Sequence, residues 1–275
     1  MNIDISIVMI CYNHEAYVRQ AIESILNQKT ELSMELIISN DKSPDDTAKL
    51  IRQVISEFPE SNIIFFDQKE NLGVSKNFAF ALNQTKGRYI AICEGDDYWI
   101  DENKLQIQYD FLKNNLDYSL VFTNISTQIG DKIKKNKPLV KTTFDSHDVI
   151  KQNPIATLSV LFRNTEENYN FIIGSNAPDQ ILWTNSAIKG KIKRLDYYTA
   201  TYRIHDGGVY SLKPEAEINL TKLSNLKYIS KLKGVNLDTV LHAWNSVEQR
   251  LIKLGHKPSL KHFIDKTIIK LRLKF

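Results

Sequence analysis

Short apolar runs alternate with segments of helical periodicity along the first 115 residues of the chain. An uninterrupted apolar run is typical of a strand that is buried on both faces of a parallel sheet. Apolar residues spaced three and four apart indicate a helix with one buried face. On these criteria the sequence predicts strands at 3–11, 35–39, 62–66 and 88–93, and helices after Asn13, after Ser43, at 74–85 and at 103–114.

Two of these helix starts can be predicted from individual residues. Asn13 can cap the first helix. Ser43 can cap the second, because Pro44 suits the first helical position and acids follow in the first turn. The buried faces of the two helices are then expected to contain Val18, Ala21, Ile22, Ile25 and Leu26 in the first, and Leu50, Ile51, Val54, Ile55 and Phe58 in the second.

Strands that alternate with helices form right-handed βαβ units and a mainly parallel central sheet flanked by helices, so the sequence predicts an α/β fold. Ligands of such sheets bind outside the carboxyl ends of the strands. Polar residues follow each predicted strand at this edge, namely Tyr12-Asn13, Asn40-Asp41, Asn71 with Gly73, and Glu94-Gly95-Asp96-Asp97. We therefore expect a binding site along the edge.

The second half of the chain has a looser pattern. We expect a strand at 119–123, a hairpin or mobile loop at 127–141, and a short helix from Ser146. Further elements are predicted as a strand at 155–162, a helix at 178–189, strands at 192–195 and 198–203, and only helix from Pro214 onward.

Composition and charge narrow the class of protein. With 275 residues and 42% hydrophobic residues, the chain is long enough to bury a sizeable core. The two cysteines, Cys11 and Cys93, each close an apolar run, so we expect both to be buried and reduced. Reduced cysteines fit a cytoplasmic protein. The net charge is +4, but residues 253–275 carry seven Lys or Arg and one acid, which leaves −2 for the rest. A nearly neutral body argues against a nucleic-acid-binding protein.

The stretch Glu94-Gly95-Asp96-Asp97 carries the clearest chemical signal. Carboxylates crowded at the end of a strand repel one another, and a hard divalent cation such as Mg²⁺ or Mn²⁺ would relieve that repulsion. The alternative is a solvated surface turn in which Gly95 provides the bend. The sequence contains no Gly-x-Gly-x-x-Gly after the first strand, no Walker A motif, no zinc-ligand pair and no nucleophile elbow.

These stretches together resemble the family 2 glycosyltransferases of the GT-A fold, and in particular bacterial surface-polysaccharide glycosyltransferases. The resemblance covers residues 3–211, and several separate motifs occur in the family's order. They are Ile7-Val-Met-Ile-Cys-Tyr-Asn13, Ala21-Ile-Glu-Ser-Ile-Leu-Asn-Gln28, Glu35-Leu-Ile-Ile-Ser-Asn-Asp-Lys-Ser-Pro-Asp-Asp-Thr47, Asn71-Leu-Gly-Val-Ser-Lys-Asn77, Gly87-Arg-Tyr-Ile-Ala-Ile-Cys-Glu-Gly-Asp-Asp-Tyr-Trp99, Gly190-Lys-Ile-Lys-Arg-Leu-Asp196 and Tyr202-Arg-Ile-His205.

The resemblance implies a role for each matching residue. The donor nucleotide would lie at the carboxyl edge, bound by residues that include Cys11, Tyr12, Asn13, Asp41, Asn77, Glu94 and Gly95. Among these, Asp41 would accept a hydrogen bond from the base, and Glu94 would reach the ribose. Asp96, the second acid of the family's Asp-x-Asp motif, and His205 would bind the metal that holds the diphosphate. Asp179 would be the catalytic base.

The sequence departs from the family pattern at Glu94, where Asp is usual, at Asn40, where Asp is common, and around Ser175-Asn-Ala-Pro-Asp179. Each assignment also has a purely structural alternative. Asp96 could be a turn acid, Asp41 a helix cap, Asp179 an acid favoured by a helix dipole, and His205 a hydrogen-bonded structural residue.

The reaction implied is metal-dependent transfer of a sugar, with inversion, from a nucleotide-diphosphate donor, by default a UDP-sugar, to an acceptor hydroxyl. The acceptor would be a glycan or a lipid-linked or protein-linked molecule. A nucleotide-sugar-binding protein without catalysis and a sugar nucleotidyltransferase are the alternatives, and a nucleotidyltransferase should carry a basic Gly-rich loop where this chain has Tyr-Asn-His-Glu. We expect a GT-A domain at 1–212, with halves 1–125 and 126–212, and a helical extension at 213–275.

The extension ends in a predicted basic amphipathic helix. One face carries apolar residues, and cations lie mostly off that face. Either this helix packs its apolar stripe on the domain, or it attaches the protein to the inner membrane face. The apolar residues are Leu260, Phe263, Ile264, Ile268 and Leu271, and the cations are Lys261, Lys266, Lys270, Arg272 and Lys274.

Overall fold

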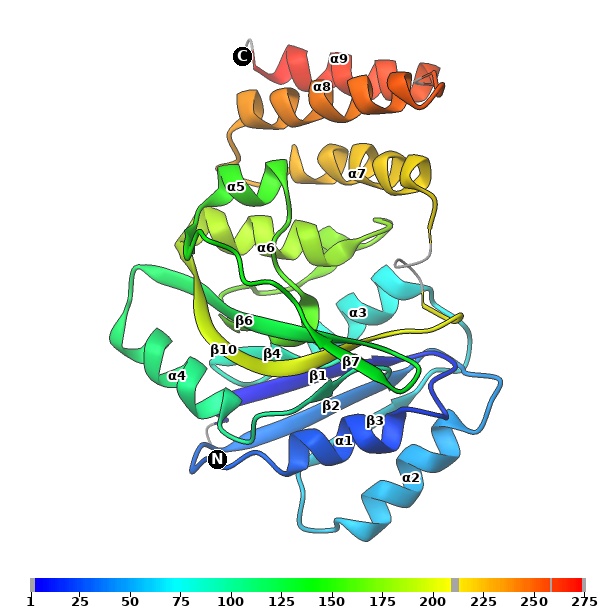
Figure 1. Cartoon of the computed structure of the whole chain (residues 1–275), viewed down its shortest axis with the longest axis vertical. Helices are drawn as coiled ribbons and strands as arrows, with labels where there is room; N and C mark the ends of the chain where they lie inside the picture. The colour runs from blue at the N-terminus through cyan, green and yellow to red at the C-terminus, as the bar shows by residue number, and fades with distance from the viewer. Residues whose placement is uncertain (1–2, 209–212, 258, 274–275) are drawn as a thin grey trace.

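A computed structural model describes residues 3–208, 213–257 and 259–273 and confirms the predicted α/β fold class (Figure 1). Four parallel strands form one half of the central sheet, in the order β3-β2-β1-β4. They are β1 (Ile5–Cys11), β2 (Met34–Asn40), β3 (Ile63–Asp67) and β4 (Tyr89–Ile92). All four point the same way, so their carboxyl ends meet at one edge.

The other half of the sheet is mixed. Strand β9 (Leu161–Arg163) is antiparallel to both β4 and the long strand β6 (Tyr118–Ile129), which it separates. Strand β10 (Lys191–Ile204) runs parallel to β6, and β5 (Tyr98–Trp99) pairs antiparallel with β10. The short strands β7 (Lys132–Lys135) and β8 (Thr143–Phe144) pair with β6 and β10.

Helices cover both faces of the sheet. Helices α1 (Val18–Leu26), α2 (Thr47–Glu57) and α4 (Lys104–Asn114) form one hydrophobic cluster with alternate residues of β1, such as Ile7 and Met9. Val8, which points to the other face, belongs to the second cluster. That cluster includes α3 (Val74–Asn83), α5 (Ser146–Lys151) and α6 (Pro178–Lys189).

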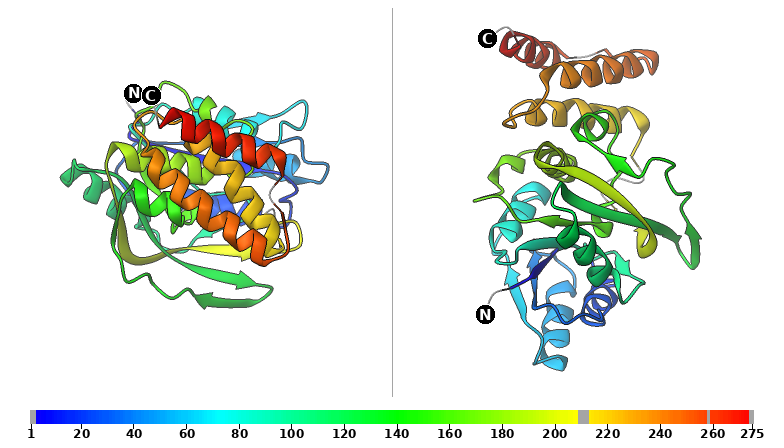
Figure 2. Two further views of the ribbon diagram at one scale, coloured as in Figure 1. Left: turned by 90° about the horizontal axis from the view of Figure 1, so that it is seen from above. Right: turned by 90° about the vertical axis from the view of Figure 1, so that its left-hand side faces the viewer.

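The second cluster continues into the three C-terminal helices, α7 (Glu215–Ile229), α8 (Leu237–Lys253) and α9 (Leu260–Arg272). Trp183 of α6, Leu226 of α7 and Trp244 of α8 all belong to it. The helices are stacked at the end of the molecule away from α1 and α2 (Figures 1 and 2). None of the described helices is both long and apolar enough to cross a membrane.

Two of the expected domain boundaries can be compared with the structure. Residues 209–212, next to the expected start of the extension, lie outside the described residues. The expected division at residue 125 falls inside β6, which runs from Tyr118 to Ile129. The two expected halves of the GT-A domain therefore share one strand.

Several predicted elements are wrong in detail. The predicted strand 155–162 is a 3₁₀ turn (Thr157–Ser159) followed by β9. The predicted strands 192–195 and 198–203 are one strand, β10, whose register shifts between Leu195 and Tyr198. A register shift breaks the alternation of side chains, so one strand looks like two in the sequence. The hairpin expected within 127–141 is present as β6 and β7.

Both predicted helix caps are also wrong. Helix α1 begins at Val18 after Tyr17, and α2 begins at Thr47 after Asp46. Asn13 lies in the left-handed region with a φ of 59°, a conformation that Asn tolerates better than most residues. Ser43 donates its hydroxyl proton to Asn40 Oδ1 (2.5 Å). Both residues connect loops at the edge of the sheet rather than capping helices.

Candidate functional site

Three strand ends meet at Asp96. The residue follows β4, His14 lies in the loop after β1, and His205 follows β10. The Oδ2 atom of Asp96 lies 3.2 Å from His205 Nε2 and 3.6 Å from His14 Nε2. All three side chains are partly buried. Two imidazole rings therefore face one carboxylate oxygen.

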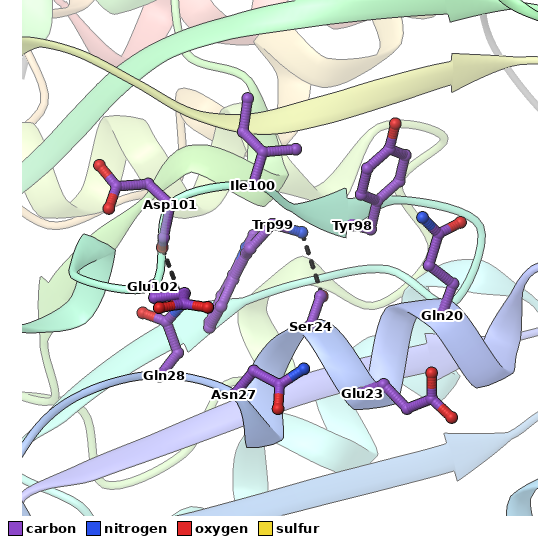
Figure 3. Close-up of a pocket in the computed structure, with 10 residues that line it drawn as sticks. All are labelled: Gln20, Glu23, Ser24, Asn27, Gln28, Tyr98, Trp99, Ile100, Asp101 and Glu102. Carbon is purple, nitrogen blue, oxygen red and sulfur yellow. Dashed lines mark hydrogen bonds between the residues drawn. The ribbon is translucent and has the colours of Figure 1, made fainter.

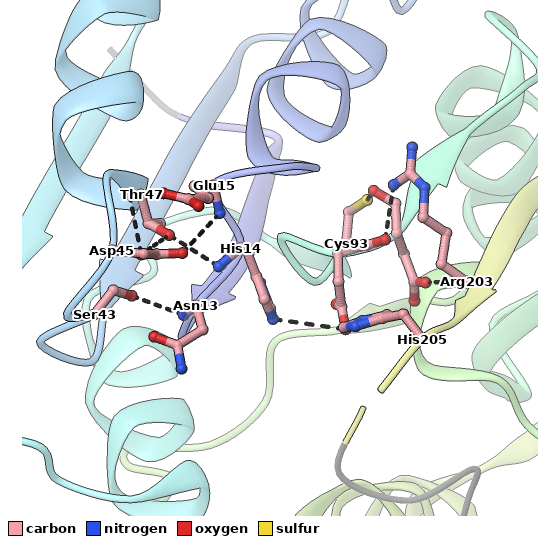
Figure 4. A network of polar contacts seen from close by, with 11 residues as sticks. Asn13, His14, Glu15, Ser43, Asp45, Thr47, Cys93, Arg203 and His205 are labelled. Carbon is pink, nitrogen blue, oxygen red and sulfur yellow. Dashed lines mark hydrogen bonds and ion pairs between the residues drawn. The ribbon is translucent and has the colours of Figure 1, made fainter. Parts of the chain in front are cut away.

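The position of His14 is fixed by the neighbouring loop. Three consecutive backbone N–H groups of the β1–α1 loop donate hydrogen bonds to side chains of the β2–α2 loop and of the first residue of α2 (Figure 4). These bonds hold the loop in the conformation that places the His14 side chain next to the Asp96 carboxylate. They run from Asn13 to Ser43 Oγ (3.0 Å), from His14 to Thr47 Oγ1 (2.9 Å) and from Glu15 to Asp45 Oδ2 (3.1 Å).

Only glycine fits at position 95, because its neighbours leave no room for a Cβ atom. A Cβ atom at this position would lie 2.5 Å from Cys11 Sγ and 2.8 Å from His14 Nδ1, distances that real Cβ atoms do not adopt. Its φ angle is outside the left-handed region, so backbone conformation does not demand glycine. The glycine lets the β4 loop lie directly on the β1 loop, which the idea of a simple surface bend does not explain.

Three carboxylates gather at this edge. Burial raises the pKa of Glu94 to about 8, and the charges of Asp96 and Asp179 add to the effect. Burial also raises the pKa of Asp179, although the amides at the start of α6 and Asn153 Nδ2, 3.2 Å from its Oδ2, oppose the shift. The pKa of Asp96 is lowered, because the hydrogen bond from His205 and the charge of His14 outweigh burial.

Asp97 and Arg203 support the site from below. The buried Asp97 accepts a hydrogen bond from the backbone N–H of Arg203 (2.9 Å), and burial together with Asp96 and Glu94 raises its pKa well above the usual range. The Arg203 guanidinium donates to the backbone oxygen of Asp96 (2.7 Å) and lies 4.3 Å from the ring centroid of Tyr98. Asp97 is thus a structural acid, and Arg203 fixes the loop that carries Asp96.

The residues fit a divalent metal ion in part. No group of three or more His, Cys, Asp or Glu side chains in the described part of the chain is arranged to hold a metal alone. Asp96 and His205, however, present an oxygen and a nitrogen side by side, which suits Mn²⁺ or Mg²⁺ completed by oxygens from a ligand. The neighbouring carboxylates Glu94 and Asp179 would be stabilised by such a cation.

The residues expected at the donor site are close together but differ in what they expose. Tyr12 and Asn13 are exposed at the edge, whereas the Cys11 side chain is buried beneath Gly95. Asp41 and Asn77 are buried and hold the β3–α3 region. The Asp41 carboxylate accepts the backbone N–H groups of Leu72 (2.6 Å) and Gly73 (3.0 Å), and Asn77 exchanges hydrogen bonds with Ser39.

Two hollows lie near this region. One, of about 280 Å³, lies between α1 and β5 (Figure 3), and its lining includes Glu23, Asp101 and Glu102. These acids would repel a diphosphate, so this hollow is a poor donor site. The other, of about 670 Å³, lies at the carboxyl end of β3 and is lined by residues 65–70 and by Leu72. It borders the loop that Asp41 holds, on the same edge as Asp96.

Sequence reasoning missed His14 and Arg203 as site residues. Arg203 lies inside the motif Tyr202-Arg-Ile-His205, and His14 directly follows Asn13, so each adjoins a stretch that had been singled out. Nothing in the sequence shows that the two converge on Asp96, because the three residues are separated by more than 80 positions. Asp179, which sequence reasoning did predict, is the second residue of α6 and lies near the same group of acids.

The chain matches the family model described as "Glycosyl transferase family 2" over residues 6–183. It is 34% identical to the uncharacterized protein Rv1520 of Mycobacterium tuberculosis over 209 residues, which cover 74% of this chain and 60% of that protein. It is 29% identical to an Escherichia coli protein over 217 residues, covering 76% of this chain and 80% of that protein. The latter is named UDP-Glc:alpha-D-GlcNAc-diphosphoundecaprenol beta-1,3-glucosyltransferase WfaP.

Two solved structures share the fold. Staphylococcus aureus TarS 1–349 in complex with UDP-GlcNAc gives a TM-score of 0.64 at 16% identity, over 90% of this chain and 72% of that chain. The mannosyltransferase PcManGT from Pyrobaculum calidifontis, in complex with GDP-Man and Mn²⁺, gives 0.62 at 12% identity, over 100% and 81%. At these identities the likeness establishes the fold only, and the chain spans about 60% of the length of the mycobacterial relative.

Proposed function

The chain belongs to glycosyl transferase family 2, and from this premise we propose that it moves a sugar from a nucleotide-diphosphate donor to an acceptor hydroxyl with inversion at the anomeric carbon. The observation that carries the proposal is the group formed by Asp96, Glu94 and Asp179 at the carboxyl edge, with His205 on Asp96. This group offers a place for a cation beside the diphosphate and a base on the acceptor side.

Asp96 and His205 would hold the divalent metal, Mn²⁺ or Mg²⁺, through Oδ2 and Nε2. When bound, the metal would neutralise the charge that develops on the departing diphosphate. Arg203 keeps Asp96 in place through its backbone oxygen (2.7 Å). Burial lowers the pKa of His14, which reduces the repulsion between this imidazole and the cation.

Asp179 would remove the proton of the acceptor hydroxyl as its oxygen attacks the anomeric carbon and the bond to the diphosphate breaks. Its raised pKa makes it a stronger base than an exposed aspartate, and Asn153 Nδ2 orients the carboxylate. At the donor site, Tyr12 and Asn13 would contact the nucleotide, and Glu94 would face the ribose. Cys11, Gly95, Asp41 and Asn77 would shape the pocket by holding its loops.

The donor we propose is a UDP-sugar, and the acceptor a glycan or a lipid-linked or protein-linked molecule of a surface polysaccharide. In support, one relative is named for a UDP-Glc donor and a diphosphoundecaprenol-linked acceptor, and another is named for minor teichoic acid biosynthesis. One structural neighbour was solved with UDP-GlcNAc. We also propose a division into a GT-A domain at 1–212, with halves 1–125 and 126–212 joined by β6, and a helical extension at 213–275.

A thermal-shift panel of UDP-Glc, UDP-GlcNAc and GDP-Man, each with and without Mn²⁺, tests the proposal. A ligand at 100 times its Kd stabilises the folded state by about 2.7 kcal/mol, which is a measurable increase in melting temperature. Asp96→Asn should lose the Mn²⁺-dependent shift while the ligand-free melting temperature stays within a few degrees. The matched control is Glu60→Gln, an exposed acid in the turn between α2 and β3, which should keep the full shift.

Donor hydrolysis in Mn²⁺ separates an enzyme from a binding protein. We expect slow release of UDP by the full chain and none by Asp96→Asn. A Mn²⁺-dependent shift in melting temperature, with neither donor hydrolysis nor transfer to any acceptor, would favour a binding protein. Full hydrolysis by Asp96→Asn would show that the metal is held elsewhere.

A further inference from the structure

Helix α9 turns its apolar stripe away from the protein. Leu260, Phe263, Ile264, Ile268 and Leu271 are between 49% and 75% exposed. We call these five side chains the tail face. Within the helix only Asp265 and Ile269 are buried, so of the two alternatives, packing of the stripe on the domain is wrong.

The contacts that hold α9 in place are largely polar. Asp265 pairs with Lys227 of α7 (2.9 Å), and Lys266 pairs with Glu248 of α8. Arg272 donates to the backbone oxygen of Ser230 (3.1 Å). Asp265 and Lys266 lie on the side opposite the tail face, and Arg272 lies at its border, so the two ion pairs specify the orientation of the helix.

Cations border the tail face, and acids are absent from it. At 100° per residue, Lys261 and Arg272 lie along one border and Lys270 along the other. Lys253 and Lys257, at the end of α8 and in the following loop, are also exposed. Between Gln249 and Leu273 the sole acid of the described residues is Asp265, which is buried and paired. Lys274 lies outside the described residues.

The position of α9 leaves the tail face open. The helix forms the outermost layer at one end of the molecule, beyond α7 and α8, and this holds in all three views (Figures 1 and 2). A flat surface could therefore meet it along its length. The apolar side chains would enter that surface, and the bordering cations would lie level with its outer layer.

We propose that α9 lies flat on an anionic membrane surface, with the tail face among the acyl chains and the bordering cations at the lipid phosphates. Charge complementarity selects this partner, because a cationic border without exposed acids is attracted to anionic headgroups. Pairing of two copies through the tail face would instead bring like charges together with no acid to neutralise them. The inference goes beyond the proposed function, because it concerns where the protein binds and not what it transfers.

Flotation of the full chain with lipid vesicles tests the proposal. The probes are vesicles of phosphatidylcholine alone and of phosphatidylcholine mixed with phosphatidylglycerol, each at low and high salt. We expect flotation with the anionic vesicles at low salt and release at high salt, since surface electrostatics are screened by ions. Each of the changes Lys257→Gln, Lys261→Gln and Lys270→Gln should weaken binding about fivefold.

The apolar contribution has a matched control. Leu260→Ser/Phe263→Ser should weaken vesicle binding about tenfold or more. The control Leu116→Ser/Val140→Ser removes two side chains that are at least as exposed but distant from α9 in the sequence, and it should leave binding unchanged. None of these side chains is buried, so the variants should fold, which circular dichroism checks. Asp96→Asn should bind vesicles like the unmodified chain, so a failure of the donor-site proposal would leave this result intact.

Three outcomes would overturn the inference. The folded full chain could stay unbound with anionic vesicles at low salt. The control variant could lose as much binding as Leu260→Ser/Phe263→Ser. Sedimentation equilibrium could also reveal dimers that Leu260→Ser/Phe263→Ser abolishes in a chain that binds no vesicles, and the tail face would then be a self-association surface.

Discussion

Replacing Gly95 by alanine should disturb the site through contact between two loops. The new Cβ would lie 2.5 Å from Cys11 Sγ and 2.8 Å from His14 Nδ1. Cys11 is buried at the end of β1, and its backbone oxygen accepts the N–H of Asp41 (2.9 Å). The sulfur therefore has little freedom to move, and the β4 loop must shift instead.

The expected cost is that of overpacking. Extra methylene groups in a packed interior typically destabilise by about 1–3 kcal/mol. Gly95 has no left-handed φ to lose, so the whole cost should come from the two contacts. Removing the sulfur in Cys11→Ala/Gly95→Ala should then relieve the shorter contact, and the double variant should cost less than the sum of the single ones by about 1–2 kcal/mol.

Urea denaturation of the four proteins of this cycle, followed by circular dichroism and tryptophan fluorescence, measures the coupling. The same proteins should be compared for Mn²⁺-dependent nucleotide binding, because a shifted β4 loop also moves Asp96. Gly95→Ala should weaken that binding, and the double variant should recover part of it. Strictly additive free energies, or a Gly95→Ala variant as stable as the unmodified chain, would refute the steric explanation.

Two further variants test the acceptor side and the core. Asp179→Asn should leave nucleotide affinity nearly unchanged and lower turnover about 10²–10⁴-fold, as expected for a general base; an equal loss of donor binding would place Asp179 in the donor pocket and make Asp206 the next candidate base. Lys104 is fully buried, which lowers its pKa to about 7, so the unfolded chain binds one more proton between pH 7 and 10. The contribution of Lys104 to the free energy of unfolding should therefore rise with pH over this window by on the order of a few kcal/mol. The raised pKa of Glu94 acts in the opposite direction near pH 8, so the quantity to measure is the difference in free energy of unfolding between the unmodified chain and Lys104→Met, by urea denaturation at pH 7, 8 and 9, and this difference should move in favour of the unmodified chain as the pH rises.

The first half of the fold follows from the sequence because its signals are local. The strands at β1 to β4 are short apolar runs, and each helix that follows carries its own periodic stripe. The two-residue strand β5 and the three-residue strand β9 have no such signal. They exist because β10 and β4 offer them unpaired edges, which depends on the tertiary fold.

The same distinction between local sequence signals and tertiary contacts applies to the site. Asp96 and His205 could be identified because they belong to motifs, and the structure places them 3.2 Å apart. The roles of His14 and Gly95 depend on a contact between two loops, so no pattern along the chain reveals them. The apolar stripe of α9 could likewise be read from its spacing. Its direction could not, because it depends on ion pairs with α7 and α8.

The C-terminal layer and the proposed base are connected through one buried side chain. Asn225 of α7 donates from Nδ2 to the backbone oxygen of Ala177 (2.9 Å) and to Gln180 Oε1 (3.3 Å), the residues on either side of Pro178 and Asp179. Asn225→Ala would remove the donor from the buried Gln180 Oε1 and the partly buried Ala177 oxygen, which costs about 1–3 kcal/mol of stability. Because the start of α6 would lose its anchor, turnover should fall further than nucleotide affinity. Equal losses of both, measured by kinetics and thermal shift, would mean that α7 supports the fold without positioning Asp179.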